Sequence, residues 1–80
     1  MKTIHVHYFA MFGENRGKQK ETVTTNASTA EELYEELKTK FGFKLPTNIV
    51  KAAINNEFAA WNAPLKDGDS VALLPPFSGG

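Results

Sequence analysis

The feature that most constrains the fold is one capped amphipathic segment near the middle of the chain. Ser28 stands three residues before Glu31, the spacing of a capping box, and Thr29 and Glu32 repeat that spacing one residue later. Apolar residues then recur at intervals of three and four and form one stripe: Ala30, Leu33, Tyr34, Leu37 and Phe41. Gly42 is a natural stop. The pattern therefore predicts one main helix that ends at Gly42.

Two strand-like segments precede this helix. Residues 3–10 are rich in β-branched and aromatic side chains. Alternation places Ile4, Val6 and Tyr8 on one face, and His5, His7 and Phe9 on the other. Residues 20–25 alternate again, and the polar segment 12–19 between the two carries two glycines. We therefore expect a loop over 12–19 and an antiparallel hairpin.

Further strand signals follow the helix. Residues 49–54 and 57–61 flank Asn55-Asn56, and asparagine tolerates the left-handed backbone of a tight hairpin turn. Residues 70–74 are the last strand candidate, and Pro75-Pro76 ends it because proline cannot donate to a sheet ladder.

The order of these elements favours an α+β fold. A single long helix covers only one face of a mixed sheet, and strand, strand, helix, then strands is the order of a β-grasp (ubiquitin-like) domain. By analogy with that fold, we expect the last strand to lie beside the first. A chain of 80 residues is one domain. We place the domain at residues 1–76 and a flexible tail at 77–80.

Composition narrows the classes of function. Nine basic residues balance nine acidic ones, which argues against a nucleic-acid binder or a protein drawn to anionic membranes, and against long-range electrostatic steering of partners. There is no cysteine, so thiolate chemistry and disulfides are excluded. No signal peptide or membrane span is indicated, and we expect a cytoplasmic protein.

Catalytic and metal-binding patterns are weak. His5 and His7 share a strand face and could bind a metal, but no third ligand is evident, so exposed or interface histidines are the favoured interpretation. No serine lies in a nucleophile motif, and the glycines do not form a phosphate-binding loop. We expect no metal, no bound cofactor and no catalysis by the chain alone.

The tail Phe77-Ser78-Gly79-Gly80 is the strongest candidate site. Glycines lack a Cβ atom, so two in succession can enter a tunnel too narrow for side chains and present a carboxylate to another enzyme. Pro75-Pro76 would stiffen the base of the tail. From the tail alone, a frayed terminus is an equal alternative; the β-grasp order favours function.

Strand alternation also predicts an exposed apolar patch. Phe9 and Leu74 fall on the sheet face opposite the predicted helix, and Phe58 can complete a patch with them. Such a patch on a small domain indicates a partner surface, whereas scattered exposed apolar residues are the alternative.

Four segments resemble the sulfur-carrier family of MoaD, the small subunit of molybdopterin synthase, and ThiS. They are Tyr8-Phe9-Ala10, Ala53-Ile54-Asn55, the run from Pro64 to Asp69, and above all the run from Val71 to Gly80. The likeness spans essentially the whole chain. It departs at 12–17, where MoaD proteins often have a helical turn containing Arg and Glu, so we assign that segment no role.

The resemblance implies sulfur carriage. A MoeB-like enzyme would adenylate the carboxylate of Gly80, and a sulfur donor would replace AMP to give a thiocarboxylate. The tail, with Gly79 as its slim approach, would then enter a MoaE-like large subunit in a heterotetramer and donate sulfur to cyclic pyranopterin monophosphate. Partner binding would use Phe9, Phe58, Leu74, Pro75, Pro76, Phe77 and Ser78.

Three alternatives remain open. A ThiS-type carrier for thiazole synthesis would use the same fold and tail chemistry, but the chain length and Pro75-Pro76 look more like MoaD. A ubiquitin-like modifier would join Gly80 to lysines of other proteins. A plain interaction module would leave the tail idle.

Overall fold

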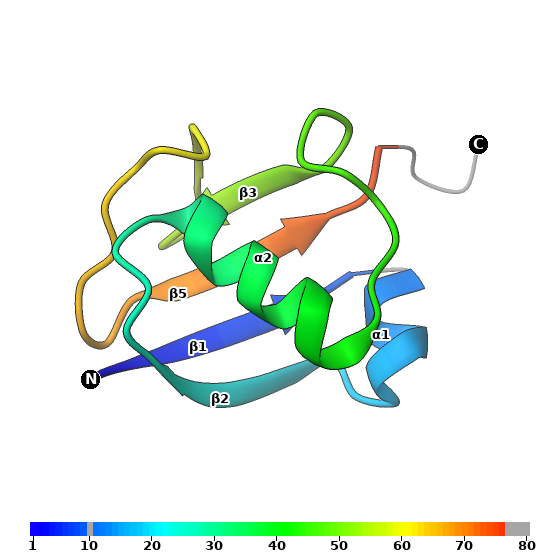
Figure 1. Ribbon diagram of the computed structural model, residues 1–80, viewed down its shortest axis with the longest axis horizontal. Coiled ribbons are helices and arrows are strands. Elements are labelled where there is room, and N and C mark those ends of the chain that lie inside the picture. The colour runs from blue at the N-terminus through cyan, green and yellow to red at the C-terminus, as the bar shows by residue number, and fades with distance from the viewer. Residues whose placement is uncertain (10, 77–80) are drawn as a thin grey trace.

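A mixed sheet of five strands forms the body of the domain. The computed structural model describes residues 1–9 and 11–76. Its elements are β1 (Lys2–Tyr8), α1 (Met11–Arg16), β2 (Lys20–Thr25), α2 (Ala30–Phe41), β3 (Lys51–Ile54), β4 (Glu57–Ala59) and β5 (Ser70–Leu74). The strands lie in the order β2-β1-β5-β3-β4, and only β1 and β5 are parallel neighbours. α2 crosses one face of this sheet (Figure 1). The predicted β-grasp fold is confirmed.

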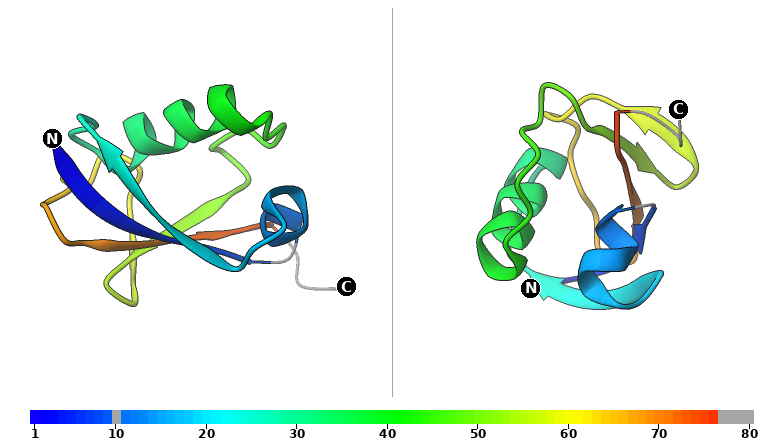
Figure 2. Two further views of the ribbon diagram at one scale, coloured as in Figure 1. Left: turned by 90° about the horizontal axis from the view of Figure 1, so that it is seen from below. Right: turned by 90° about the vertical axis from the view of Figure 1, so that its right-hand side faces the viewer.

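The core lies between α2 and the sheet (Figure 2, left). The two central strands contribute Ile4 and Val6 from β1 and Val71 and Leu73 from β5, all 0–1% exposed. The helix α2 contributes a stripe of buried side chains to the same core: Ala30, Leu33, Tyr34 and Leu37. Each large apolar side chain buried in this way stabilises the fold by about 1.5–3 kcal/mol. The predicted faces of β1, β5 and α2 are therefore the ones that the structure buries.

Both ends of α2 are capped by the residues that the sequence indicated. Thr29 is the N-cap, and its hydroxyl accepts the backbone N–H of Glu32 at 3.2 Å. The Glu32 carboxylate accepts the backbone N–H of Ser28 at 2.8 Å. The second of the two predicted registers is therefore the one formed. Gly42 ends the helix with a φ of 76°, and its N–H donates to the carbonyl of Lys38.

The predicted hairpin of β3 and β4 is present but shorter than expected. Asn55 and Asn56 form its turn with φ values of 52° and 73°. The prediction of strand over 57–61 was wrong beyond Ala59, because the carbonyls of Trp61 and Ala63 turn away to accept N–H groups of the first helical turn of α2. At the other end, residues 49 and 50 precede β3 and lie in or just after a turn in which the N–H of Ile49 donates to Pro46.

The prediction of a loop over 12–19 was wrong, because residues 11–16 form the helix α1. The helix packs against the end of β1: a Cβ on Gly13 would lie 3.4 Å from the backbone oxygen of Tyr8, an ordinary van der Waals contact. Gly17 has a φ of 70°, the conformation that commonly ends helices. The ring of Phe12 is buried against Tyr34 and Phe43.

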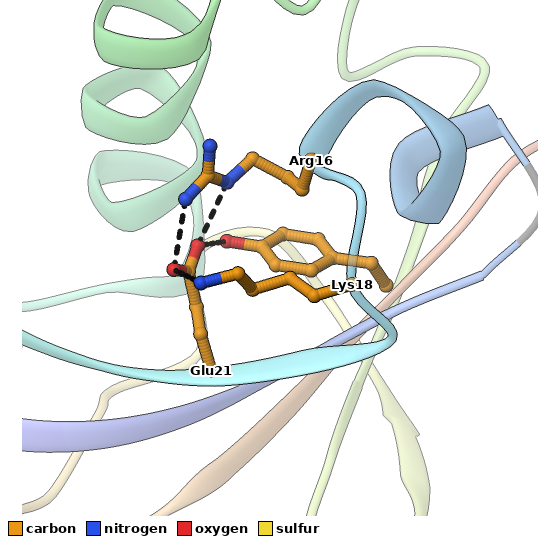
Figure 3. A network of polar contacts seen from close by, with 4 residues as sticks. Arg16, Lys18 and Glu21 are labelled. Atoms are coloured by element: carbon orange, nitrogen blue, oxygen red, sulfur yellow. Dashed lines mark hydrogen bonds and ion pairs between the residues drawn. The ribbon is translucent and has the colours of Figure 1, made fainter.

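A polar network fastens α1 to the hairpin (Figure 3). Arg16 donates two hydrogen bonds of 2.9 Å to the carboxylate of Glu21 on β2. The hydroxyl of Tyr8 donates to the same carboxylate, and the Lys18 ammonium lies 3.6 Å from it. The Arg16 guanidinium also lies 3.6 Å from the ring centre of Phe41 on α2. One carboxylate thus joins β1, β2 and α1.

These contacts shift the pKa values of three members of the network, and the hydrogen bonds to Glu21 raise the pKa of Arg16. The hydrogen bonds from Arg16 lower the pKa of Glu21 to about 2, against the opposing effect of burial and with a further contribution from Tyr8. Burial raises the pKa of Tyr8, and its bond to Glu21 raises it further. Glu21 is ionised and Tyr8 protonated at neutral pH, which is the pairing that the network needs, and the two pKa shifts widen the pH range over which it holds.

Replacing Gly42 tests the cap of α2. Gly42→Ala places a Cβ at a positive φ and is expected to lower the free energy of unfolding by about 1 kcal/mol. Gly42→Asn is the matched control and should lose less, since asparagine tolerates this conformation. Urea unfolding of the two variants measures the difference. An alanine variant as stable as the asparagine variant would contradict the assignment.

Replacing Glu21 tests the network. Glu21→Gln is expected to lower the free energy of unfolding by about 1–3 kcal/mol near neutral pH. The folded-state pKa lies below the ordinary 4.5, so the carboxylate's contribution is complete above pH 4.5 and is lost as the pH falls towards about 2. Unfolding curves across this range should therefore converge with those of the wild type. Glu14→Gln, an exposed carboxylate on α1, is the control and should change little. A stability gap that stays constant with pH would refute the network.

Candidate functional site

The predicted tail follows β5, the strand at the centre of the sheet. β5 lies between β1 and β3 and pairs with both. Val71 and Leu73 anchor it in the core, after which Pro75 is half-buried and Pro76 is exposed. Because β1 and β5 are parallel, they end at the same side of the molecule, where α1 also lies (Figure 2). The predicted site residues Phe77, Ser78, Gly79 and Gly80 lie outside the described residues.

The face of the sheet opposite α2 borders this end of β5, and we call it the open face. Strand pairing aligns one row of residues across all five strands of it: Lys20, His7, Ala72, Ala53 and Phe58. A second, shorter row contains Leu74 of β5 and Lys51 of β3. The open face therefore combines small and apolar residues in its middle with lysines towards its sides.

The three apolar residues expected to form a patch all belong to the open face. Phe58 is 79% exposed and Phe9 is 46% exposed, which is unusual for phenylalanine. Leu74 is half-buried and pairs with Lys51. The sequence thus predicted their placement, and their role in binding a partner stays a prediction.

A shallow hollow lies on the open face beside Phe9. Its volume is about 270 Å³, and its lining includes Phe9, His7, Ala72 and Ala53. Ala53 is also the strand partner of Phe58. The two alanines keep the surface low beside the large Phe9 ring, and the polar residues Asn55, Asn56 and Ser70 complete the lining, so the hollow can receive a protruding side chain from another protein. Sequence reasoning missed these alanines, although strand alternation from Leu74 and Phe58 pointed to them.

The corner of the open face next to α1 has a fixed shape. A groove there is lined by residues of β1, α1 and the turn into β2, among them Phe9, Gly13 and Lys18. The network centred on Glu21 holds these three elements together from the core side. Phe9 directly follows Tyr8, so the network fixes the backbone from which the Phe9 ring projects. We assigned this segment no role from the sequence, although Glu14 early and Arg16 late in it match the charge pattern of a short helix.

The histidines do not assemble a metal site in the part of the chain that the structure describes. No group of three His, Cys, Asp or Glu side chains suited to a metal occurs there. His5 instead lies on the open face, with its Nδ1 atom 3.3 Å from the hydroxyl of Thr22. Within residues 1–9 and 11–76, neither helix has the length and apolar character needed to cross a membrane.

Known proteins resemble the chain over nearly its whole length. The molybdopterin synthase sulfur carrier subunit of Escherichia coli is 31% identical over 80 residues, covering 96% of this chain and 99% of the relative. The putative molybdopterin converting factor subunit 1 of Pyrococcus furiosus has a similar structure, with a TM-score of 0.77 and 29% identity over 96% of this chain and 100% of the other.

A third relative was solved in a complex. It is the protein-protein complex of subunits 1 and 2 of the molybdopterin-converting factor of Helicobacter pylori, whose matching chain has a TM-score of 0.67 and 30% identity. The match covers 98% of this chain and 99% of that one. Residues 6–80, from within β1 to the end of the predicted tail, match the ThiS family. The chain therefore belongs to the ThiS family.

Proposed function

We propose that this protein is the sulfur-carrier small subunit of a molybdopterin synthase. The observation that carries the proposal is the family match, which extends from residue 6 in β1 to the Gly79-Gly80 tail. The Escherichia coli relative that bears this name aligns over 99% of its own length. The open face beside the end of β5 provides the surface that such a subunit needs for docking.

The proposed chemistry resides at the end of the tail. An adenylating enzyme of the MoeB kind converts the Gly80 carboxylate to an acyl-adenylate, with loss of pyrophosphate from ATP. A sulfur nucleophile then displaces AMP, which leaves a thiocarboxylate on Gly80. The thiocarboxylate supplies sulfur to cyclic pyranopterin monophosphate for the dithiolene of molybdopterin. The chain itself contributes the acyl group, the slim Gly79 approach and the docking surface.

The proposed partner is a large subunit of the MoaE kind, in a heterotetramer. Support comes from the Helicobacter pylori relative, which was solved together with a subunit 2. The exposed side chains of Phe58 and Phe9 suit the apolar part of a partner surface, and the hollow beside Phe9 can receive a side chain from it. β5 links this surface to the tail, since its residues Ala72 and Leu74 belong to the open face and Pro75-Pro76 follow directly. The cytoplasmic location stays a prediction.

Changing the tail tests the carrier chemistry. The protein incubated with the adenylating enzyme, ATP and a sulfur source should gain the mass of one oxygen-to-sulfur exchange, located at Gly80 by fragmentation. With the large subunit, the thiocarboxylated protein should convert cyclic pyranopterin monophosphate to molybdopterin. Deleting Gly80, or adding residues after it, should abolish the conversion while the circular dichroism spectrum is unchanged.

Two outcomes would contradict the carrier proposal. One is protein that stays unmodified beside an adenylating enzyme active on its own carrier. The other is the appearance of conjugates to lysines of other proteins in place of the thiocarboxylate, which would indicate a modifier.

Changing the open face tests the docking surface. Phe58→Ser, Phe9→Ser and Leu74→Ser should each weaken binding to the large subunit, and Phe58→Ser by about tenfold or more, because a buried aromatic anchor contributes at least about 2 kcal/mol. Ile49→Ser is the matched control: Ile49 is 38% exposed but lies in the loop before β3. Isothermal titration calorimetry gives the affinities, and thermal unfolding checks that each variant is folded. If all three substitutions leave the affinity at the wild-type value, another surface binds the partner.

A further inference from the structure

The acidic and basic residues of this chain, whose net charge is zero, are distributed unevenly between the two sides of the domain. Strand alternation assigns twelve strand residues to the open face, and none of them is Asp or Glu: Thr3, His5, His7, Lys20, Thr22, Thr24, Lys51, Ala53, Phe58, Ser70, Ala72 and Leu74. The carboxylates of β2 and β4, Glu21 and Glu57, belong to the other face. The open face is therefore positive although the chain as a whole has no net charge.

The opposite side of the molecule carries the compensating charge. α2 presents four exposed carboxylates to solvent: Glu31, Glu32, Glu35 and Glu36. Its lysines come at the C-terminal end, where they suit the helix dipole. Since α2 covers the core face of the sheet, the two sets of charges lie on opposite sides of the domain (Figure 1). Carboxylates border the open face at three places: Glu14 lines the groove shared by Lys18 and Lys20, Glu21 lines a hollow with His5 and His7, and Asp69 accepts a hydrogen bond from Asn55 beside Ser70.

Lys20 and Lys51 flank the apolar middle of the open face. Lys20 ends the row that runs through His7, Ala72 and Ala53 to Phe58. Lys51 pairs with Leu74 and lines a hollow with Phe58. Both lysines are exposed, and within the described residues neither forms an ion pair. Their charges are thus free for a partner.

We propose that the open face binds a protein surface with an apolar centre and carboxylates at its rim, which meet Lys20 and Lys51. The proposal rests on the proposed function and specifies the chemistry of its partner. Two lysines separated by alanine and phenylalanine suit a protein better than a nucleic acid, whose binding draws on many phosphate contacts. Charge at the rim of an interface mainly raises the rate of association. Lys20 and Lys51 therefore steer the encounter, and the apolar residues hold the complex.

Charge reversal on the two faces tests this assignment. The test variant carries both Lys20→Glu and Lys51→Glu. The matched control carries both Lys40→Glu and Lys44→Glu, which replace two exposed lysines in and just after α2 and change the net charge by the same amount. Stopped-flow mixing with the cognate large subunit gives the association rate at several salt concentrations. The open-face variant should associate about tenfold more slowly at low salt, and its rate should rise as salt is added. The helix-side variant should keep nearly the wild-type rate.

The outcomes separate the two proposals. Wild-type protein that does not bind the large subunit contradicts the proposed function. The steering by Lys20 and Lys51 is overturned if the open-face variant associates with the large subunit as fast as the wild type. It is also overturned if the two double variants are slowed equally. Gel shifts with single-stranded RNA and sedimentation with phosphatidylserine vesicles should show no binding. RNA or vesicle binding that the open-face variant loses, while large-subunit association stays unchanged, would assign these lysines to an anionic polymer or membrane instead.

Discussion

The parallel pairing of β1 with β5 is the constraint on which the rest of the structure depends. It brings the two ends of the chain together in the middle of the sheet, with Val6 beside Val71 and Tyr8 beside Leu73. The helix α2 packs against these side chains in the core. Because the two strands run the same way, the end of β5 meets the end of β1 and the start of α1 at one side of the molecule. The end of β5, the open face and α1 therefore lie close together, although the residues that form them are far apart in the chain.

The corner around α1 shows how a small domain holds a short helix. Six residues are too few for a helix to be stable alone. Phe12 fastens α1 to the core from one side, and the bonds from Arg16 to Glu21 fasten it from the other. Glu21 is itself a strand residue whose side chain points towards α2, so the hairpin supplies the anchor. The same contacts fix the end of β1, from which Phe9 extends onto the open face.

Sequence reasoning succeeded where the signal was local. The capping pair of Thr29 and Glu32, the stop at Gly42 and the turn at Asn55-Asn56 each depend on residues within a few positions of one another. It failed where contacts with residues far away in the sequence determine the local structure. Segment 12–19 looked like a loop because Gly13 and Gly17 lower helix propensity, and the contacts that outweigh this come from Tyr8, Glu21 and Tyr34. The strand after Phe58 ends early because the start of α2 needs the carbonyls of Trp61 and Ala63.

By itself, the sequence determined the fold class, the faces of the central strands and the family. The signals for them are the periodicity, the helix caps and the closing Pro-Pro and Gly-Gly pairs, which all depend on residues close together in the sequence. It also determined a net charge of zero, from which no electrostatic steering was expected. Only the tertiary structure decided where those charges lie. Strand pairing brings Lys20 and Lys51, far apart in the chain, onto one acid-free face, while α2 carries its glutamates on the opposite side. Net charge is a sum over residues, whereas the field that a partner meets depends on their positions.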